Sequence, residues 1–222
     1  MNQLFFGDNL NVLRDHIANE SVDLIYLDPP FKSNRDYNLL FKSAKGEKSE
    51  AQIEAFKDSW YWGEQATREI DELLHHKNTD VAQMIHALVA FLGRNDMTAY
   101  LVMMSTRLLE MHRVIKPTGS LYLHCDPAAE HYLKIVLDQI FGPTHFRNEI
   151  IWKRTTAHND PGRYGANIDI LLFYTKGDKW LWNVQYIPHD DEYKSRFHHR
   201  DSDGRLWSDD NLTAKGLSGG GY

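Results

Sequence analysis

The sequence predicts an α/β fold built on a mostly parallel sheet. Two apolar runs, 23–27 and 120–125, show no alternation of polar and apolar residues, so each suits a strand buried on both faces of such a sheet. A helical pattern of apolar residues ends at Val114 and is followed by the turn 116–119, which leads into the second run. Helix, turn and buried strand in succession are typical of α/β proteins.

The first expected element is a short strand at 4–6, an apolar run closed by a glycine. Apolar residues then recur at helical spacing from Leu10 to Ile17, which predicts a helix. Asp8 or Asn9 is the expected N-cap, because a short polar side chain accepts hydrogen bonds from the free amides of a first helical turn.

The stretch between the two apolar strands is mostly polar, and we interpret about 33–98 as a partly helical insertion. A helix is expected near 49–57. The aromatic cluster 60–62 is expected to hold the insertion against the domain rather than to bind a ligand.

After the second apolar strand, Pro127 is expected to open a helix that ends before Gly142, since proline favours the first helical turn. Two further strand-like runs, 149–152 and 168–174, are joined by a polar loop and not by a helix. This predicts an antiparallel hairpin at the edge of the sheet. Helical periodicity is lost after residue 176, so residues 1–176 and 177–222 are expected to be separate regions.

The composition, 42% hydrophobic and 25% charged residues, is that of an ordinary folded protein and argues against disorder. No apolar run approaches the roughly 18 residues of a membrane helix, and the N-terminus lacks signal-peptide features. We therefore expect a cytoplasmic protein with no membrane partner. The single cysteine, Cys125, excludes an internal disulfide and a Cys-x-x-Cys metal site.

The formal net charge of −6 removes the simplest argument for a nucleic-acid binder, which is a strongly basic chain. Segment 147–176 differs, with five basic and three acidic residues. Any phosphate-contacting surface is therefore expected to be local.

The motif most informative about function is Asp28-Pro29-Pro30-Phe31, at the end of the first apolar strand where open α/β sheets bind ligands. A proline pair by itself is more often only a strand terminator. Here an aspartate that requires hydrogen-bond donors, two carbonyls with no competing amide and an aromatic ring are consecutive. Together they suit a planar ring that bears an amino group.

This motif resembles that of DNA amino-methyltransferases, which use S-adenosyl-L-methionine to methylate the exocyclic amine of adenine or cytosine. The family motif is Asp, Asn or Ser, then Pro-Pro, then Tyr, Phe or Trp. Segments 114–124 and 148–153 also resemble the family, and the motif's place near the N-terminus is similar to one of its branches. The resemblance implies a Rossmann-like methyltransferase sheet, with 1–176 as the catalytic domain and 177–222 as the start of a target-recognition region.

The resemblance assigns the chemistry to Asp28 and the Pro29 carbonyl, which would accept the amine hydrogens and free the nitrogen lone pair for attack on the sulfonium methyl. Pro30 completes the rigid motif, and Phe31 would stack on a base flipped from the duplex, with core packing as the alternative. Asp28 and Asp8 are the implied cofactor contacts, with helix capping alone as the alternative for Asp8. Aspartate in the first motif position favours adenine weakly over cytosine.

Trp152, Lys153 and Arg154 are expected to contact DNA or the target base, although a core position for Trp152 is equally favoured. Double-stranded DNA is the expected substrate, and a homodimer or a restriction-modification partner is the expected assembly. No metal is expected, because the histidines within 189–199 lack metal-ligand spacing.

One element of that branch is not found: a Phe-x-Gly-x-Gly loop around the methionine part of the cofactor. The glycine-rich segment 216–221 follows no apolar strand. We therefore expect a C-terminally truncated sequence, in which residues 1–222 alone bind S-adenosyl-L-methionine weakly or not at all. The alternative is a non-catalytic DNA-recognition subunit that relies on another chain for the loop.

Two other enzyme classes fit less well. Glu149 and Lys153 are four residues apart, not the two usual for restriction-type nucleases. An ATPase would require a Gly-x-x-x-x-Gly-Lys loop, which the sequence lacks.

Overall fold

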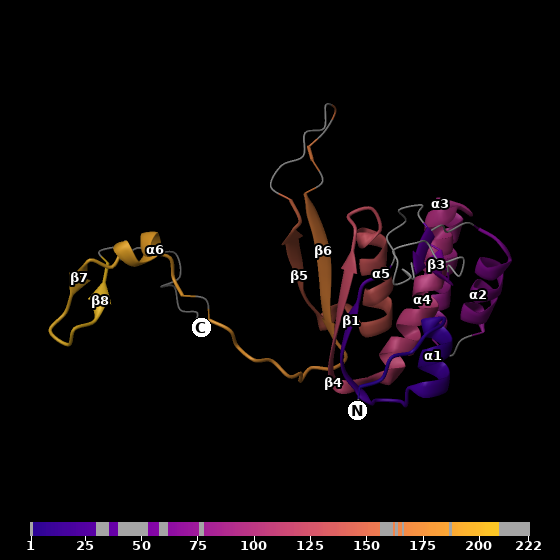
Figure 1. Cartoon of the computed structure of the whole chain (residues 1–222), viewed down its shortest axis with the longest axis horizontal. Helices are drawn as coiled ribbons and strands as arrows, with labels where there is room; N and C mark the ends of the chain where they lie inside the picture. Colours follow the sequence, from indigo (N-terminus) through magenta and orange to yellow (C-terminus); the bar gives the residue numbers. More distant parts are fainter. Residues whose placement is uncertain are drawn as a thin grey trace, which may run out of the picture. The chain divides into compact units, whose positions relative to one another are not determined.

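The computed structural model describes residues 2–29, 36–39, 53–57, 62–75, 78–155, 162, 164–165, 167–186 and 188–208. Tertiary contacts divide the chain into two compact units, Met1–Leu181 and Trp182–Tyr222. The first unit holds a central sheet and its helices (Figure 1). None of the helices in the described part of the chain has the length and hydropathy required to span a membrane.

A four-stranded sheet in the order β1-β4-β6-β5 forms the centre of the first unit. β1 (Val22–Leu27) runs parallel to β4 (Ile115–Cys125), and β6 (Ile168–Thr175) runs antiparallel to β4 and to β5 (Phe146–Lys153). The predicted strands at 23–27 and 120–125 and the edge hairpin are confirmed. The sheet is mixed, not mostly parallel, because the β5–β6 hairpin reverses the chain and creates two antiparallel pairs.

The helices of the first unit follow the chain order α1 (Asn9–His16), α2 (Glu64–Leu74), α3 (Thr79–Leu92), α4 (Asp96–Val114), α5 (Glu130–Phe141) and the short 3-10 helix η1 (Pro143–His145). The predicted helices after Asp8 and before the turn 116–119 are confirmed. α5 begins three residues after Pro127, because the Asp126 carboxylate accepts a hydrogen bond from the Ala129 amide at 3.0 Å and holds a turn there.

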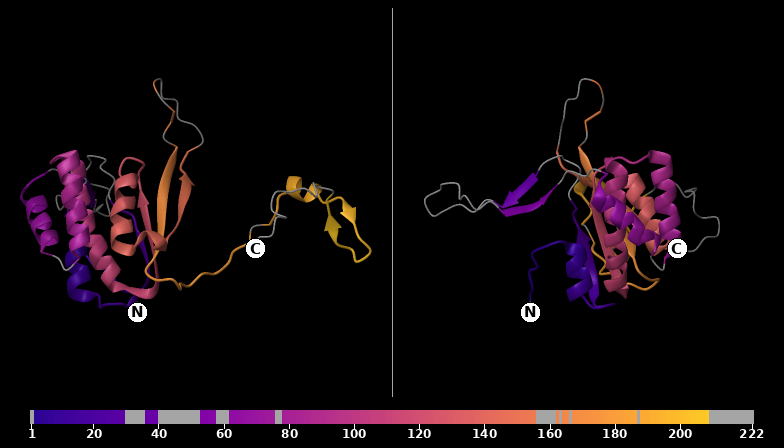
Figure 2. Two further views of the ribbon diagram at one scale, coloured as in Figure 1. Left: turned by 180° about the vertical axis from the view of Figure 1, so that it is seen from behind. Right: turned by 90° about the vertical axis from the view of Figure 1, so that its right-hand side faces the viewer.

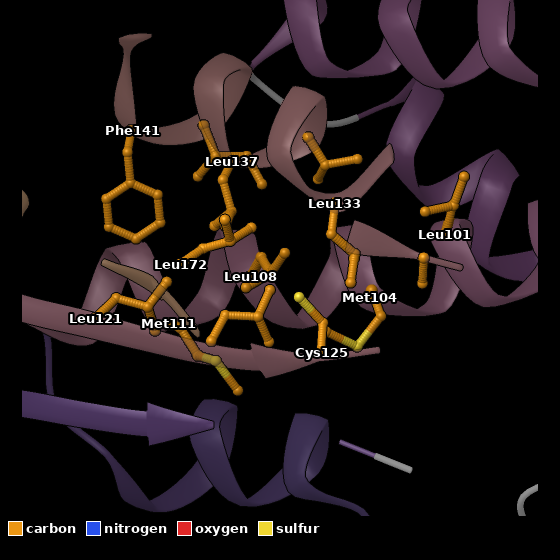
Figure 3. Packing of buried hydrophobic residues seen from close by; sticks show 14 of the residues in the cluster. Leu101, Met104, Leu108, Met111, Leu121, Cys125, Leu133, Leu137, Phe141 and Leu172 are labelled. Atoms are coloured by element: carbon orange, nitrogen blue, oxygen red, sulfur yellow. The ribbon is translucent and has the colours of Figure 1, made fainter. Parts of the chain in front are cut away.

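The hydrophobic core lies between one face of the sheet and the helices (Figure 3). On β4 the side chains alternate: Leu121, Leu123 and Cys125 are fully buried, while Tyr122 and His124 between them are partly exposed on the opposite face. α3 contributes Val81 and Ile85 to the same core, so the core extends into the range expected as an insertion. Further members from α4 and α5 are Leu101, Met104, Leu108, Met111, Leu133, Leu137 and Phe141.

Two expected features near the N-terminus are wrong. Residues 4–6 form no strand, and Leu4 is 98% exposed, because no strand among the described residues pairs with them. β1 is not buried on both faces: Leu24 and Tyr26 are 56% and 55% exposed. β1 occupies an edge of the described sheet, so its apolar run is covered less than the run in β4.

The helix expected near 49–57 is also wrong where the structure describes it. Residues Ile53–Lys57 form β3, which pairs antiparallel with β2 (Asp36–Leu39). Pairing between segments distant in the sequence overrides the helical preference of glutamate, alanine and lysine. Of the aromatic cluster, Trp62 packs against the core as expected, whereas 60–61 lie outside the described residues.

The second unit contains α6 (Asp191–Ser195) and a small hairpin of β7 (His199–Arg200) and β8 (Leu206–Trp207). His199 stacks on Trp207 with their ring centroids 4.4 Å apart. Gly204 lies in the connecting turn at φ 81°, a conformation that favours glycine.

Candidate active site

Asp28 directly follows β1 and lies beside the carboxyl end of β4. The register pairs Leu27 with Leu123, so parallel pairing brings Asp28 level with His124. The Asp28 side chain is 57% exposed, and Pro29 behind it is buried. The Asp28 carboxylate is therefore an accessible hydrogen-bond acceptor next to a buried proline, at the sheet edge where ligand binding is expected. Pro30 and Phe31, the remaining residues of the motif, lie outside the described residues.

His124 bridges from β4 towards two neighbouring strands. Its Nδ1 lies 3.3 Å from Asp28 Oδ1 and 3.4 Å from the Tyr26 hydroxyl of β1. On its other side, Nε2 lies 3.4 Å from Asp169 Oδ2, at the start of β6. The His124 side chain is only 15% exposed, so it is held between the two carboxylates in a sparsely hydrated position.

Asp169 is the buried end of this group, with only 4% of its surface exposed. A buried carboxylate is costly unless it is compensated, and Arg154 Nε lies 3.3 Å from its second oxygen, Oδ1. β6 is antiparallel to β4, so β6 begins at the edge where β1 and β4 end. The sheet thus aligns Asp28, His124, Asp169 and Arg154 in one row.

Sequence reasoning found Asp28 and Arg154 and missed His124 and Asp169. A signal was present: each is a polar residue within a run that is otherwise apolar, 120–125 and 168–174. Such residues are placed in a core-forming strand only if the structure supplies polar partners for them. In the described part of the chain, no group of three or more His, Cys, Asp or Glu side chains is arranged to hold a metal ion.

Asp8 is the N-cap of α1, as expected, and it has a second partner. Its Oδ1 accepts a hydrogen bond from the Leu10 amide at 2.9 Å. Arg107 Nη2 donates to both carboxylate oxygens, at 3.0 and 2.9 Å, and Arg107 Nη1 lies 3.4 Å from Glu69. The strand expected at 4–6, just before Asp8, is absent, so Asp8 does not follow a strand. Its contact with the cofactor remains a prediction.

Trp152 and Lys153 end β5 and Arg154 follows it, and all three are exposed, Trp152 at 60%. The core alternative for Trp152 is therefore wrong. Cys125, the last residue of β4, pairs with Ile170, so this end of the β5–β6 hairpin projects past β4 (Figure 2). The hairpin carries its exposed tryptophan and basic residues beside the row that starts at Asp28.

Comparison with known proteins identifies the family. A family model described as DNA methylase matches residues 22–216, which are most of the chain and include Asp28, His124, Asp169 and Arg154. This chain belongs to the DNA methylase family. The structure of this DNA methylase and the match together establish the partial Rossmann-like fold that the sequence implied.

The curated relatives are longer than this chain. The Mod subunit of the type III restriction-modification enzyme StyLTI of Salmonella typhimurium is 28% identical over the whole chain, which covers 31% of that protein. The EcoP15I Mod subunit of Escherichia coli is 27% identical over 80% of the chain and 24% of its own length. The chain spans about a third or less of these relatives.

Among solved structures, PvuII DNA methyltransferase, described as cytosine-N4-specific, is 12% identical with a TM-score of 0.43, over 79% of this chain and 49% of that one. A DNA modification methylase of Thermus thermophilus, TTHA0409, is 19% identical with a TM-score of 0.42, over 94% of this chain and 68% of that one.

Cys125 of this DNA methylase is fully buried inside β4, as the sequence predicted. Burial, and then the carboxylates of Glu130 and Asp126, raise the pKa of its thiol to about 12. A thiol of this kind is protonated at neutral pH and is a poor nucleophile.

Proposed function

We propose that this protein methylates DNA, transferring a methyl group from S-adenosyl-L-methionine to the exocyclic amine of a flipped base. The single observation that carries the proposal is the exposed Asp28 carboxylate, followed by buried Pro29, at the carboxyl edge of the sheet in a chain of the DNA methylase family. We propose adenine as the base, because the motif begins with aspartate. Cytosine is the second candidate.

Asp28 is proposed to promote methyl transfer through its negative charge. The lone pair of an exocyclic amine is delocalised into the base, so the amine is a poor nucleophile. The Asp28 carboxylate and the Pro29 carbonyl accept hydrogen bonds from the two N–H groups of the amine. These hydrogen bonds draw the nitrogen towards tetrahedral geometry and free its lone pair. As the nitrogen–methyl bond forms and the sulfur–methyl bond of the donor breaks to leave a neutral thioether, positive charge develops on the nitrogen, and the Asp28 carboxylate stabilises it. The nitrogen then releases one proton to solvent.

The candidate site fits a sulfonium cofactor in charge, since Asp28 presents an exposed carboxylate at the edge. When bound, S-adenosyl-L-methionine supplies an electrophilic methyl group. Asp28 is the residue proposed to face that group, and Asp8 the residue proposed near its adenine. Because Arg107 already holds both oxygens of Asp8, an adenine contact by Asp8 requires a carboxylate oxygen to be shared.

DNA contact is proposed for two places. Phe31 would stack on the flipped base next to Asp28, since chemistry on a stacked, paired base is blocked. Trp152 and Lys153, exposed at the end of the hairpin, would meet the duplex or the base. Arg154 Nε lies 3.3 Å from Asp169, and the Arg154 side chain is half exposed. The same side chain could therefore pair with Asp169 and contact DNA.

The relatives named as Mod subunits of restriction-modification enzymes support the same biological role for this protein. We propose that it modifies DNA in the cytoplasm and works with a restriction partner or as a homodimer. Analytical ultracentrifugation of the purified protein, with and without duplex DNA, would distinguish a monomer from a dimer.

The proposed function is tested with the full-length protein, which is incubated with methyl-labelled cofactor and duplexes of varied sequence before the nucleosides produced are analysed. Labelled N6-methyl-2′-deoxyadenosine is the expected product. Labelled N4-methyl-2′-deoxycytidine would select the second candidate, and label in neither would contradict the proposal. Asp28→Ala should abolish transfer while DNA affinity changes little, because Asp28 acts mainly as charge develops.

A further inference from the structure

We infer that His124, anchored by Asp169, is a positioning residue that holds the Asp28 carboxylate in its working orientation. The inference rests on the proposed function and extends it to two residues that the Asp-Pro-Pro-Phe motif does not contain. Its basis is the row of contacts across β1, β4 and β6: Asp28 Oδ1 to His124 Nδ1 at 3.3 Å, and His124 Nε2 to Asp169 Oδ2 at 3.4 Å.

Asp28 requires such support because its own surroundings constrain it little. It follows the last residue of β1, and its side chain is 57% exposed. An exposed carboxylate turns freely about its side-chain bonds, whereas methyl transfer requires the acceptor oxygen at a fixed position beside the amine. Misplacement of a reacting group by about 1 Å can cost about 100-fold in rate.

His124 can supply the support because each of its ring nitrogens lies within 3.4 Å of a carboxylate oxygen. The side chain is 15% exposed and comes from β4, a strand whose alternate residues are fully buried, so its backbone is firmly held. Asp169, 4% exposed, lies at the far side of the ring. Arg154 Nε lies 3.3 Å from Asp169 and compensates its charge. The buried Asp169 carboxylate can therefore stay in place beside His124.

The charges around the ring are consistent with this role. The titratable groups that face His124 are Asp28 and the Tyr26 hydroxyl from β1 and Asp169 from β6, with Arg154 behind Asp169. Two carboxylates lie on opposite sides of one imidazole, each close to one ring nitrogen. A rotation of the ring would move both nitrogens away from these oxygens.

The chain offers a matched control at the opposite end of the same hairpin. His145 Nε2 lies 3.4 Å from Asp178, so it forms a His–Asp pair of the same type and length as the pair of His124 with Asp169. His145 precedes β5 and Asp178 follows β6, whereas the candidate site lies where β5 ends and β6 begins.

The test is a double-mutant cycle of single-turnover methylation. His124→Gln and Asp169→Asn should each slow transfer by about 100-fold while cofactor and DNA affinity change less than threefold. If His124 acts through Asp28, adding His124→Gln to Asp28→Asn should cause no further loss, because the group it positions is already impaired. His145→Gln should be as active as wild type. Thermal unfolding shows which variants fold. If His124→Gln does not fold, Asp169→Asn still tests the inference.

The contact itself is tested without catalysis by the imidazole nitrogen chemical shifts of His124. These should change on Asp28→Asn and stay unchanged on Asp178→Asn. Losses that multiply in the double variant, a fully active His124→Gln, or shifts that ignore Asp28→Asn would each overturn the inference. A full-length wild-type protein that transfers no methyl group overturns the proposed function instead, whatever the chemical shifts show.

Discussion

At the scale of single residues, the function depends on whether Asp28 works through its charge or only through its shape. An asparagine in its place keeps the shape and one acceptor oxygen. It loses the negative charge that would stabilise the nitrogen as the methyl group arrives. The structure leaves this side chain accessible, so the substitution can be made without disturbing the core.

We therefore predict that Asp28→Asn slows single-turnover methylation strongly but leaves residual activity. Asp28→Ala, which lacks any acceptor, should be slower still. The rates are measured on unmodified and hemimethylated duplexes with saturating cofactor. An Asp28→Asn rate within twofold of wild type would mean that charge at this position contributes nothing to the reaction.

Phe31 provides a second residue-scale prediction, on capture of the base. Stacking of a base on an aromatic ring is worth on the order of 1 to 3 kcal/mol. Phe31→Ala should weaken binding of a duplex with a destabilised target base by that amount, while Phe31→Tyr and Phe31→Trp should largely preserve it. If all three variants bind alike, Phe31 does not stack on the base.

His112 makes the stability of the protein depend on pH. Burial, and then the positive charges of Lys176 and His145, lower the pKa of His112 to about 4 in the folded protein, from 6.5. The unfolded chain therefore binds a proton first as the pH falls. The contribution of His112 to stability is complete above about pH 6.5 and is lost progressively towards pH 4.

We predict that the free energy of unfolding decreases by on the order of 2 kcal/mol between pH 7 and pH 4.5 on account of His112, allowing for its partial exposure. Urea unfolding at a series of pH values measures this. His112→Gln should reduce the slope, whereas His86→Gln, exposed on α3, should not. An unchanged slope in His112→Gln would assign the pH dependence to other groups.

At the scale of elements, Arg107 on α4 joins three helices. Its guanidinium contacts Asp8 before α1 and Glu69 on α2, and it is only 7% exposed. Removing it would leave the 9%-exposed Glu69 without its cation. Breaking a buried pair in this way costs about 3 to 5 kcal/mol.

Arg107→Met should accordingly lower the free energy of unfolding by about 3 kcal/mol, measured by urea denaturation. The control is Arg14→Met. Its partner Glu72 is half exposed and its second partner, Glu110, keeps Arg113, so its loss should cost less than about 1 kcal/mol. Equal losses of unfolding free energy in the two variants would show that burial of the Arg107 ion pairs does not increase their contribution to stability.

The elements also show what the sequence can predict and what it cannot. The strand 120–125, the helix before it and the β5–β6 hairpin have strong local patterns, and the structure confirms them. Residues 4–6 and Ile53–Lys57 were misjudged because strands depend on distant partners, which a local pattern does not contain. His124 and Asp169 meet only through the antiparallel register of β4 and β6, so the motif revealed Asp28 without them.

At the scale of the whole molecule, the stability of the chain is concentrated in the first unit. Every member of the hydrophobic core cluster lies between Leu73 and Tyr174, and no described residue after Leu181 belongs to it. The segment just before that point is nevertheless well anchored. The Lys176 amide donates to the Gly119 carbonyl at 3.1 Å, and Arg147 stacks over Trp180 at 3.9 Å.

We therefore predict that residues 1–181 unfold with the same midpoint in urea as residues 1–222, because none of the described residues in the segment removed belongs to the hydrophobic core. A shorter chain, residues 1–175, is the informative control. It loses the Lys176 ammonium that donates to the Ile115 carbonyl at 2.8 Å, the Gly177 carbonyl that accepts from Arg147 at 3.1 Å, and Trp180. At about 1 kcal/mol for each hydrogen bond, it should be less stable by about 2 to 3 kcal/mol. If 1–181 were destabilised as much as 1–175, the second unit would have to contribute to the stability of the first.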